Sequence, residues 1–283
     1  MMPSNPAPPA APARDDAILP ATRLVAAVVL PFLLAAFLIL YIRPQTTDRL
    51  FAWEIASPLT AAWMGAGYLS GAYFFARVLT GRRWHRVGGG FLPIAAFTAA
   101  MLLATLLHWE TFNPAHWPFR VWLALYLITP ILVPALWAIN RRRDDGAPEE
   151  DDQIVPGVLR RVLFVAGLLM AGGALFLLLA PAAAAEIWPW PLTPLTARVL
   201  AGWQTLLAVG LLTISPEPRW SAWRIPLHTI LIWQGGLLLA FVLRGDAFRP
   251  AGRLNWFTLY SLAGFVALMA LLIFMERRRR KVS

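Results

Sequence analysis

Hydrophobic and polar positions alternate along this chain in long blocks. Eight apolar stretches of about 20 residues are separated by shorter segments that carry most of the charged side chains. A helix of roughly 20 apolar residues crosses a bilayer core of about 30 Å. The pattern therefore predicts an all-α integral membrane protein with eight transmembrane helices, near residues 24–42, 58–76, 91–108, 119–139, 159–181, 194–214, 225–243 and 255–275.

Short phrases of the first half return in the second half. One spacing, 136 residues, leads from SPLTA at 57 to TPLTA at 193, from RW at 83 to RW at 219, and from FNPA at 112 to FRPA at 248. We interpret this as a tandem duplication of a four-helix unit. Because four spans return the chain to its starting side, both copies keep one orientation. A pseudo-two-fold axis along the membrane normal is then expected to relate them.

The same pattern predicts a division of the chain into five parts. We expect a disordered cytoplasmic tail (1–20), a first four-helix repeat (21–143), a solvated charged linker in the cytoplasm (144–157), a second repeat (158–276) and a basic cytoplasmic tail (277–283).

The repeated phrase itself has the chemistry of a helix start. Ser57 and Thr193 are good N-cap residues, and Pro58 and Pro194 follow at the first helical position. Both phrases are therefore predicted to begin an inward-going helix rather than to bind a ligand.

Tryptophans and small residues next to the phrase predict where these helices lie. Trp53, Trp188 and Trp190 precede the phrases and are expected at the outer membrane interface. Gly67 and Gly71 form a G-x-x-x-G pattern, which allows close approach of helix backbones. The second and sixth helices are therefore expected at the centre of the bundle.

Basic residues predict the orientation in the membrane. With the amino terminus in the cytoplasm, 18 of the 25 lysine and arginine residues lie in inner segments and 7 in outer ones. The positive-inside rule then predicts a multi-pass protein of a bacterial cell (inner) membrane with both termini cytoplasmic. Because the arginines lie between apolar spans, the lipid bilayer explains the net charge of +10 and no nucleic-acid partner is expected.

Composition narrows the chemistry further. Only 14% of residues are charged, against about 25% in soluble domains, which excludes an ordinary soluble globule. The absence of cysteine excludes disulfides, thiolate zinc sites and Fe–S ligation. The sequence shows no serine-nucleophile motif and no charged group in mid-span, so no catalytic residue, metal or cofactor is predicted. Gln204 and Gln234 are interpreted as interhelical hydrogen-bonding residues.

The outer face is the one region with candidate ligand chemistry. Aromatic surfaces and arginines suit lipid or glycan head groups, whereas an interfacial belt with local ion pairs is the alternative. Arg198 opposes the dipole of the helix that it opens, so we expect it to pair with Glu186, Asp246 or an external anion. The candidate ligand-binding residues are His108, Trp109, Glu110, Glu186, Arg198, Arg244 and Asp246.

Three classes of function remain open. The absence of buried charge favours a membrane-embedded scaffold or an accessory subunit of other membrane proteins. The duplication favours a transporter or lipid-handling protein with a site between the halves. The outer residues allow an enzyme acting on a lipid-linked substrate. A pocket between the halves, lined by Gln204, Gln234 and tyrosines, would favour transport, and a closed interface would favour the scaffold.

Overall fold

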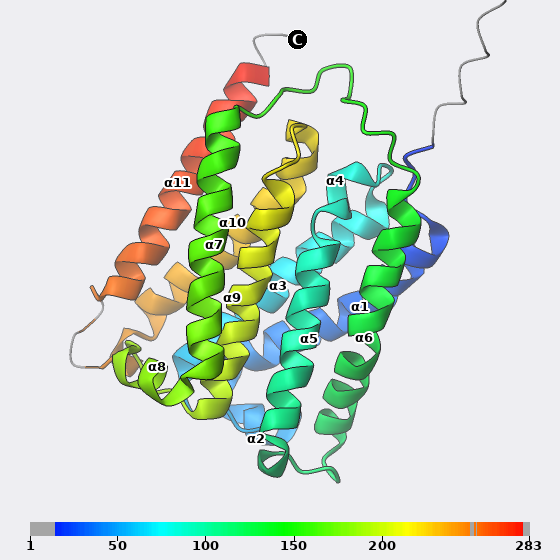
Figure 1. Cartoon of the computed structure of the whole chain (residues 1–283). Helices are drawn as coiled ribbons and strands as arrows, with labels where there is room; N and C mark the ends of the chain where they lie inside the picture. The colour runs from blue at the N-terminus through cyan, green and yellow to red at the C-terminus, as the bar shows by residue number, and fades with distance from the viewer. Residues whose placement is uncertain (1–14, 250–251, 253, 280–283) are drawn as a thin grey trace, which may run out of the picture.

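The computed structural model describes residues 15–249, 252 and 254–279, which form helices joined by short segments (Figure 1). The long helices are α1 (Pro20–Phe37, continued by the π-helical η1, Leu38–Ile42), α3 (Pro58–Thr80), α5 (Phe91–Leu107), α6 (Trp117–Arg141), α7 (Gly157–Leu179), α9 (Pro194–Ile214), α10 (Trp220–Leu243) and α11 (Trp256–Arg279). The short helices are η2 (Pro44–Thr46), α2 (Thr47–Leu50), α4 (His85–Gly88), η3 (Trp109–Thr111), α8 (Pro181–Ile187) and η4 (Gly245–Ala247).

The helices confirm the predicted fold class in its broad form. Within the described residues, seven helices are long and apolar enough to cross a membrane. The remaining long helix, α3, has 23 residues but is not among these seven. Fifteen of its residues are buried inside the protein. Only a small part of its surface can therefore face lipid, so the helix needs fewer strongly apolar side chains than the other spans. The bundle is thus a multi-pass helical membrane protein.

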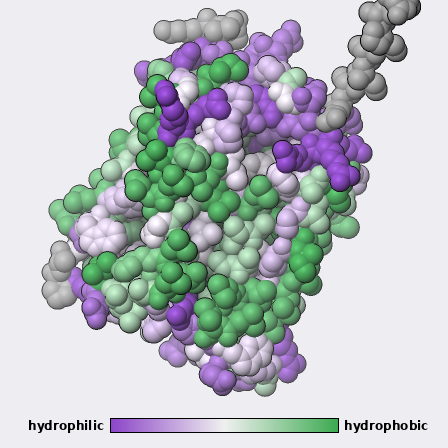
Figure 2. All heavy atoms as spheres, in the orientation of Figure 1, coloured by the Kyte–Doolittle hydropathy of each residue, from purple (hydrophilic) through white to green (hydrophobic). Residues whose placement is uncertain are grey.

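Burial separates central helices from peripheral ones. α3 and α9 lie at the centre, as predicted, and Gly67 of α3 leaves room for the ring of Trp203 from α9. α1, α6, α7 and α11 instead expose many large apolar side chains. Figure 2 shows one face of the bundle, where hydrophobic side chains form a broad surface and hydrophilic residues gather mainly towards the upper end.

The two ends of the bundle differ in composition. We call the end that holds α4, residues 144–156 and the last turn of α11 the charged end. The opposite end, with residues 43–57, 108–117, 180–193 and 244–249, is the tryptophan end. The described chain begins and finishes at the charged end (Figure 1).

The helix starts within the repeated phrase are confirmed. The Ser57 hydroxyl accepts a hydrogen bond from the Thr60 amide at 3.3 Å. Thr193 accepts from the Thr196 amide at 3.1 Å, and the Thr196 hydroxyl bonds back to Thr193 to form a capping box. Each helix end therefore satisfies backbone donors that would otherwise be unpaired.

Helix contacts repeat between the halves. α1 packs on α3 as α7 packs on α9, and α6 packs on α5 as α11 packs on α10. The other extensive contacts between long helices cross between the halves, since α5 packs on α9 and α10 packs on α3. Neither half therefore forms a separate four-helix bundle.

Two predicted flexible segments take part in the fold. Residues 1–14 of the expected disordered tail lie outside the described residues, but Asp16 and Ile18 are buried, contrary to that expectation. The linker 144–157 is not simply solvated either, because Asp144, Glu149 and Asp152 all bond to other segments. Both segments are held by polar contacts at the charged end.

The tryptophans before the repeated phrases also differ from the expectation. Trp53, Trp188 and Trp190 are buried rather than placed in a belt against lipid. The Trp190 indole donates to the Thr60 hydroxyl at 2.9 Å, which joins the second phrase to the first. Aromatic packing therefore forms the protein core at this end.

Candidate functional site

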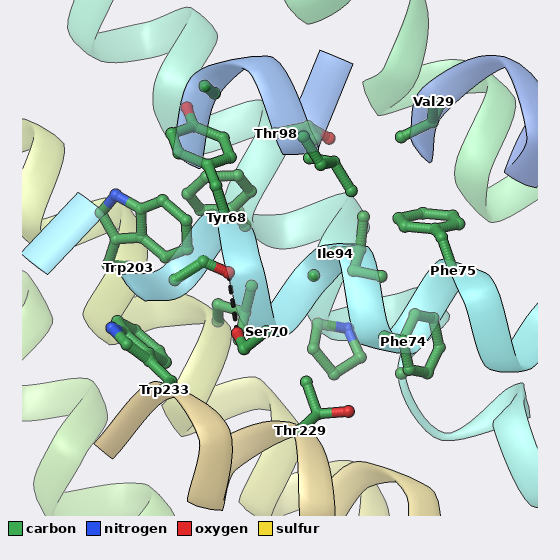
Figure 3. A pocket seen from close by; sticks show the side chains of 18 of the residues that line it. Val29, Tyr68, Ser70, Phe74, Phe75, Ile94, Thr98, Trp203, Thr229 and Trp233 are labelled. Carbon is green, nitrogen blue, oxygen red and sulfur yellow. Dashed lines mark hydrogen bonds between the residues drawn. The ribbon is translucent and has the colours of Figure 1, made fainter. Parts of the chain in front are cut away.

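A cavity of about 440 Å³ lies at the centre of the described structure. Its walls come mainly from α1, α3, α5 and α6 of the first half and from α9 and α10 of the second, with single residues of α2 and α7 and two of α11. Figure 3 shows Tyr68, Trp203 and Trp233 at one side of the cavity and Phe74, Phe75 and Val29 at the other. It therefore lies where the halves meet but mainly within the first.

The hydroxyl groups that line the cavity already have partners in the protein. Tyr68 and Tyr126 share a hydrogen bond of 3.0 Å between their hydroxyls. The hydroxyls of Ser70, Thr98 and Thr229 donate to carbonyls of their own helices. Because these polar atoms are satisfied, the cavity offers mainly apolar contact and suits a ligand without polar groups along its length.

One edge of the cavity lies between α1 and α6. At the charged end, Asn140 of α6 accepts from the Leu19 amide at 3.0 Å and donates to the Thr22 hydroxyl at 2.7 Å. From there the two helices diverge towards the tryptophan end (Figure 1). Phe32, Leu50 and Trp117 line the cavity along this edge and are also exposed, so hydrocarbon outside the protein can reach it.

The glutamines predicted to line a transport pocket lie elsewhere. Gln204 makes a side-chain hydrogen bond with Tyr260 of α11. The Oε1 atom of Gln234 has no hydrogen-bond partner among the described residues. Neither side chain lines the central cavity.

A second feature, the polar centre, joins four segments at the charged end. His85 Nδ1 lies 2.5 Å from Asp16 Oδ2, and His85 Nε2 lies 3.0 Å from Ser221 Oγ. The Ser221 hydroxyl donates to Asp152, whose other oxygen accepts from the Ser221 amide at 2.8 Å. Glu149 Oε1 lies 3.1 Å from His85 Nε2. We define the polar centre as these five residues.

The order Asp16, His85, Ser221 is that of a charge-relay triad, although the sequence predicted no nucleophile–base arrangement. The hydrogen of the serine hydroxyl is directed to Asp152 rather than to the histidine. The amides of Trp220, Ser221 and Ala222 are also all bonded, so none is free to stabilise an oxyanion. The geometry therefore does not support attack by this serine.

The sequence carried an unused signal for the polar centre. Asp16 and Asp152 are 136 residues apart, as are His85 and Ser221. The Asp16 carboxylate accepts from the His85 amide at 3.1 Å, as Asp152 does from Ser221. The repeat spacing could therefore have paired these positions before the contacts were known.

Ion pairs surround the polar centre. Arg219 bonds to both Asp144 and Glu217 at 2.8 Å, and these hydrogen bonds raise the pKa of Arg219. Burial alone raises the pKa of Glu149, but the Arg86 guanidinium, at 2.6 Å, lowers it overall. The Glu149 carboxylate therefore remains ionised at neutral pH.

At the tryptophan end, Arg198 has different partners from those expected. Its Nη1 lies 2.7 Å from His108 Nε2, and its Nε donates to the Leu178 carbonyl at 3.1 Å. Burial, and then the charge of Arg198, lower the pKa of His108, so the neutral ring accepts this hydrogen bond. Arg198 therefore caps the carboxyl end of α7, which explains a cation at this end of the bundle.

Two other arginines at the tryptophan end act in the same way. Arg244 donates to the Tyr41 carbonyl in η1, and Arg249 donates to the Ala185 and Glu186 carbonyls near the end of α8. In the described residues, no ion pair joins Arg198 or Arg244 to a carboxylate.

Of the seven predicted ligand-binding residues, only His108 and Arg198 are brought into direct contact. Glu110, Glu186 and Asp246 have exposed side chains, and Trp109 packs its ring against Phe119 at 5.7 Å. A shared ligand site for the seven remains a prediction.

A search for metal-binding groups among the described residues and comparisons with known proteins were both without a match. Within residues 15–249, 252 and 254–279, no group of three or more histidine and acidic side chains is placed to hold a metal ion. No family model, curated protein or solved structure matches the chain.

Proposed function

We propose that this membrane protein binds the hydrocarbon chain of a membrane lipid in its central cavity. The lining carries the proposal, because it is aliphatic and aromatic with its hydroxyls already bonded. The volume of about 440 Å³ falls within the range of pockets for small ligands. An empty apolar cavity forfeits dispersion contacts that a bound chain restores.

An apolar cavity lined by helices of both halves distinguishes the two leading hypotheses. The cavity thus favours lipid handling over the scaffold hypothesis, which predicts a filled interface between the halves. The outer-face enzyme is less well supported, since Glu110 and Asp246 have exposed side chains.

The proposal is tested by filling the cavity. Gly210 lines it, and a Cβ there meets only Pro93 at 3.7 Å, so Gly210→Leu should fold and occupy the ligand's space. Gly172→Leu on α7 is the matched control, because a Cβ there meets nothing within 4 Å. Lipids extracted from each purified protein would be quantified by mass spectrometry.

We expect Gly210→Leu to lose a lipid that the native protein and Gly172→Leu both retain. If all three proteins retain the same lipids in the same amounts, lipid binding in the cavity is wrong and the scaffold hypothesis leads.

The finer architecture is part of the same proposal. We propose that α3 crosses the membrane in addition to the seven apolar helices, and that the resulting eight spans are two copies of one four-helix unit. The matching helix contacts of the halves support this, as do the matching caps at Ser57 and Thr193. In an experimental structure, α1–α6 should superpose on α7–α11 after a rotation near 180° about the membrane normal.

We also propose that the charged end faces the cytoplasm of a bacterial cell, as the basic residues predict. Ala147 and Ala115 are exposed at opposite ends of this cysteine-free chain. In intact cells, an impermeant thiol reagent should label Ala115→Cys and not Ala147→Cys. The reverse pattern would invert the orientation.

A further inference from the structure

We propose that His85 is a proton-dependent latch at the charged end. When its ring carries two protons, it ties α4 to the start of α10, to the segment before α1 and to the linker. Loss of one proton releases the tie between the halves.

The geometry around the ring favours its doubly protonated form. Asp16 Oδ2 lies 2.5 Å from Nδ1, and Glu149 Oε1 lies 3.1 Å from Nε2. An ionised carboxylate only accepts hydrogen bonds, so each nitrogen needs a hydrogen. A neutral imidazole has one N–H and leaves its other nitrogen facing an acceptor.

Ser221 cannot supply the missing hydrogen. Its hydroxyl donates to Asp152, so its oxygen is left to accept from His85 Nε2 at 3.0 Å. A ring protonated only at Nδ1 would therefore place a lone pair against the oxygens of both Ser221 and Glu149. The contact across the halves requires the second proton.

Charged groups face this site from every neighbouring element, and most are paired with one another. Arg86 and Arg219 bond the surrounding carboxylates rather than the ring. α10 contributes Ser221, and its cation Arg224 pairs with Glu276 of α11. The acidic groups near the ring are Asp16, Asp144, Glu149 and Asp152. The basic groups are Arg83 before α4, Arg86 within α4, Arg143 after α6, which pairs with Asp15, and Arg219 before α10.

The latch acts next to the central cavity. Gly89 and Gly90 follow α4 and line the cavity, while Trp223 and Pro226 of α10 line it from the other half. His85 and Ser221 hold these two walls together one helical turn away. Release of the latch therefore opens the charged end of the cavity to water, whether or not a lipid occupies it.

The second repeat supplies a matched control variant. Ser221 makes the same two bonds to Asp152, from its amide and side chain, that His85 makes to Asp16. In His85→Ser, the new hydroxyl can bond to Asp16 in the same way. The variant keeps the local fold and removes only the titratable ring and its contacts with Ser221 and Glu149.

Thiol labelling measures the opening. Gly89→Cys introduces a single thiol into this cysteine-free chain, and its Cβ meets only the flexible end of Ile214 at 3.1 Å. Labelling rates with a charged maleimide would be compared with and without His85→Ser. The ratio of the two rates cancels the pH dependence of the thiol itself.

We expect the His85 protein to label about tenfold more slowly than the His85→Ser protein near pH 5.5, as loss of one charge-assisted hydrogen bond implies. The two rates should converge as the pH rises and the ring loses its second proton. A ratio that does not change with pH overturns the latch.

If His85→Ser does not fold, the protonation state decides the matter in the native protein. The chain has four histidines, so ¹⁵N-histidine NMR can resolve their rings. Both nitrogens of His85 should carry hydrogens in the acid range, where each faces an acceptor, and one hydrogen should be lost as the pH rises. A His85 ring that stays neutral in the acid range would overturn the latch without affecting lipid binding, because lipid extraction tests that separately.

Discussion

The charged end and the tryptophan end close the same bundle with different chemistry. At the charged end, side chains of opposite charge join distant segments, as in Glu149 with Arg86 and Asp144 with Arg219. At the tryptophan end, buried rings pack together and arginines donate to backbone carbonyls. The strength of the ion pairs depends on pH and on salt concentration. The strength of the aromatic packing depends on the apolar area that is buried. The ends should therefore respond to different perturbations.

The largest effect is expected from the aromatic core of the tryptophan end. Trp190 is fully buried, and its ring lies near those of Trp63, Trp188 and Phe257. Trp190→Ala should destabilise the protein by about 3–5 kcal/mol, because it leaves a cavity and removes the hydrogen bond to Thr60. Reversible unfolding in mixed micelles would measure this.

Trp117→Ala is the control for that change. Its side chain is 62% exposed, so the expected effect is within about 0.5 kcal/mol. Equal losses in the two variants would contradict the contrast between a packed core and an exposed edge.

At the charged end, Arg219→Ala should cost about 2 kcal/mol. Removal of one partner from a fully buried pair costs more, but Asp144 and Glu217 are partly exposed. Burial alone raises the pKa of Asp144, yet the hydrogen bond from Arg219 lowers it overall. This stabilisation is therefore present at neutral pH and is lost as the pH falls through the lowered pKa.

Unfolding free energies measured against pH test this sign. The native protein should lose stability in acid more steeply than Arg219→Ala, and the exposed Arg142→Ala should follow the native curve. Parallel curves for all three proteins would show that the ion pair does not contribute.

The smallest effect is expected at Arg198. Arg198→Ala removes hydrogen bonds to His108 and to the Leu178 carbonyl and should cost about 1 kcal/mol. Because the folded pKa of His108 is lowered, the native protein should lose part of this stability as the pH falls below the ordinary range of histidine.

The same variant separates capping from ligand binding. Retention of lipid or glycan would be measured in Arg198→Ala, Asp246→Ala and the double variant. Capping predicts unchanged retention in all three, whereas loss of a bound head group would support the predicted outer site.

The sequence predicted the helices well because their signals are local. The span 194–214 matches α9, and the N-caps at Ser57 and Thr193 lie where the phrase placed them. α3 was less clear by composition, because its surroundings are protein rather than lipid. The placement of Trp53 and Trp190 in a lipid belt was wrong, since the same residues can pack inward when partners are available.

The polar centre was missed for a different reason. Asp16, His85, Glu149 and Ser221 are spread over more than 200 residues, and each alone is typical of a solvated loop or helix end. Only the packing of α10 on α3 and α4 brings them together. The sequence could not predict that Arg198 bonds to the Leu178 carbonyl, because any residue can supply a backbone carbonyl.

The crossed helix contacts have a consequence for biosynthesis. α3 is covered by α10, and α5 is covered by α9, so the first half cannot finish packing when it leaves the ribosome. At about 5–20 residues per second, α3 waits on the order of ten seconds for α10 to be made. During that time its small and polar surface needs shelter in the insertion machinery. Insertion of the first half and assembly of the bundle are therefore separate events in the cell.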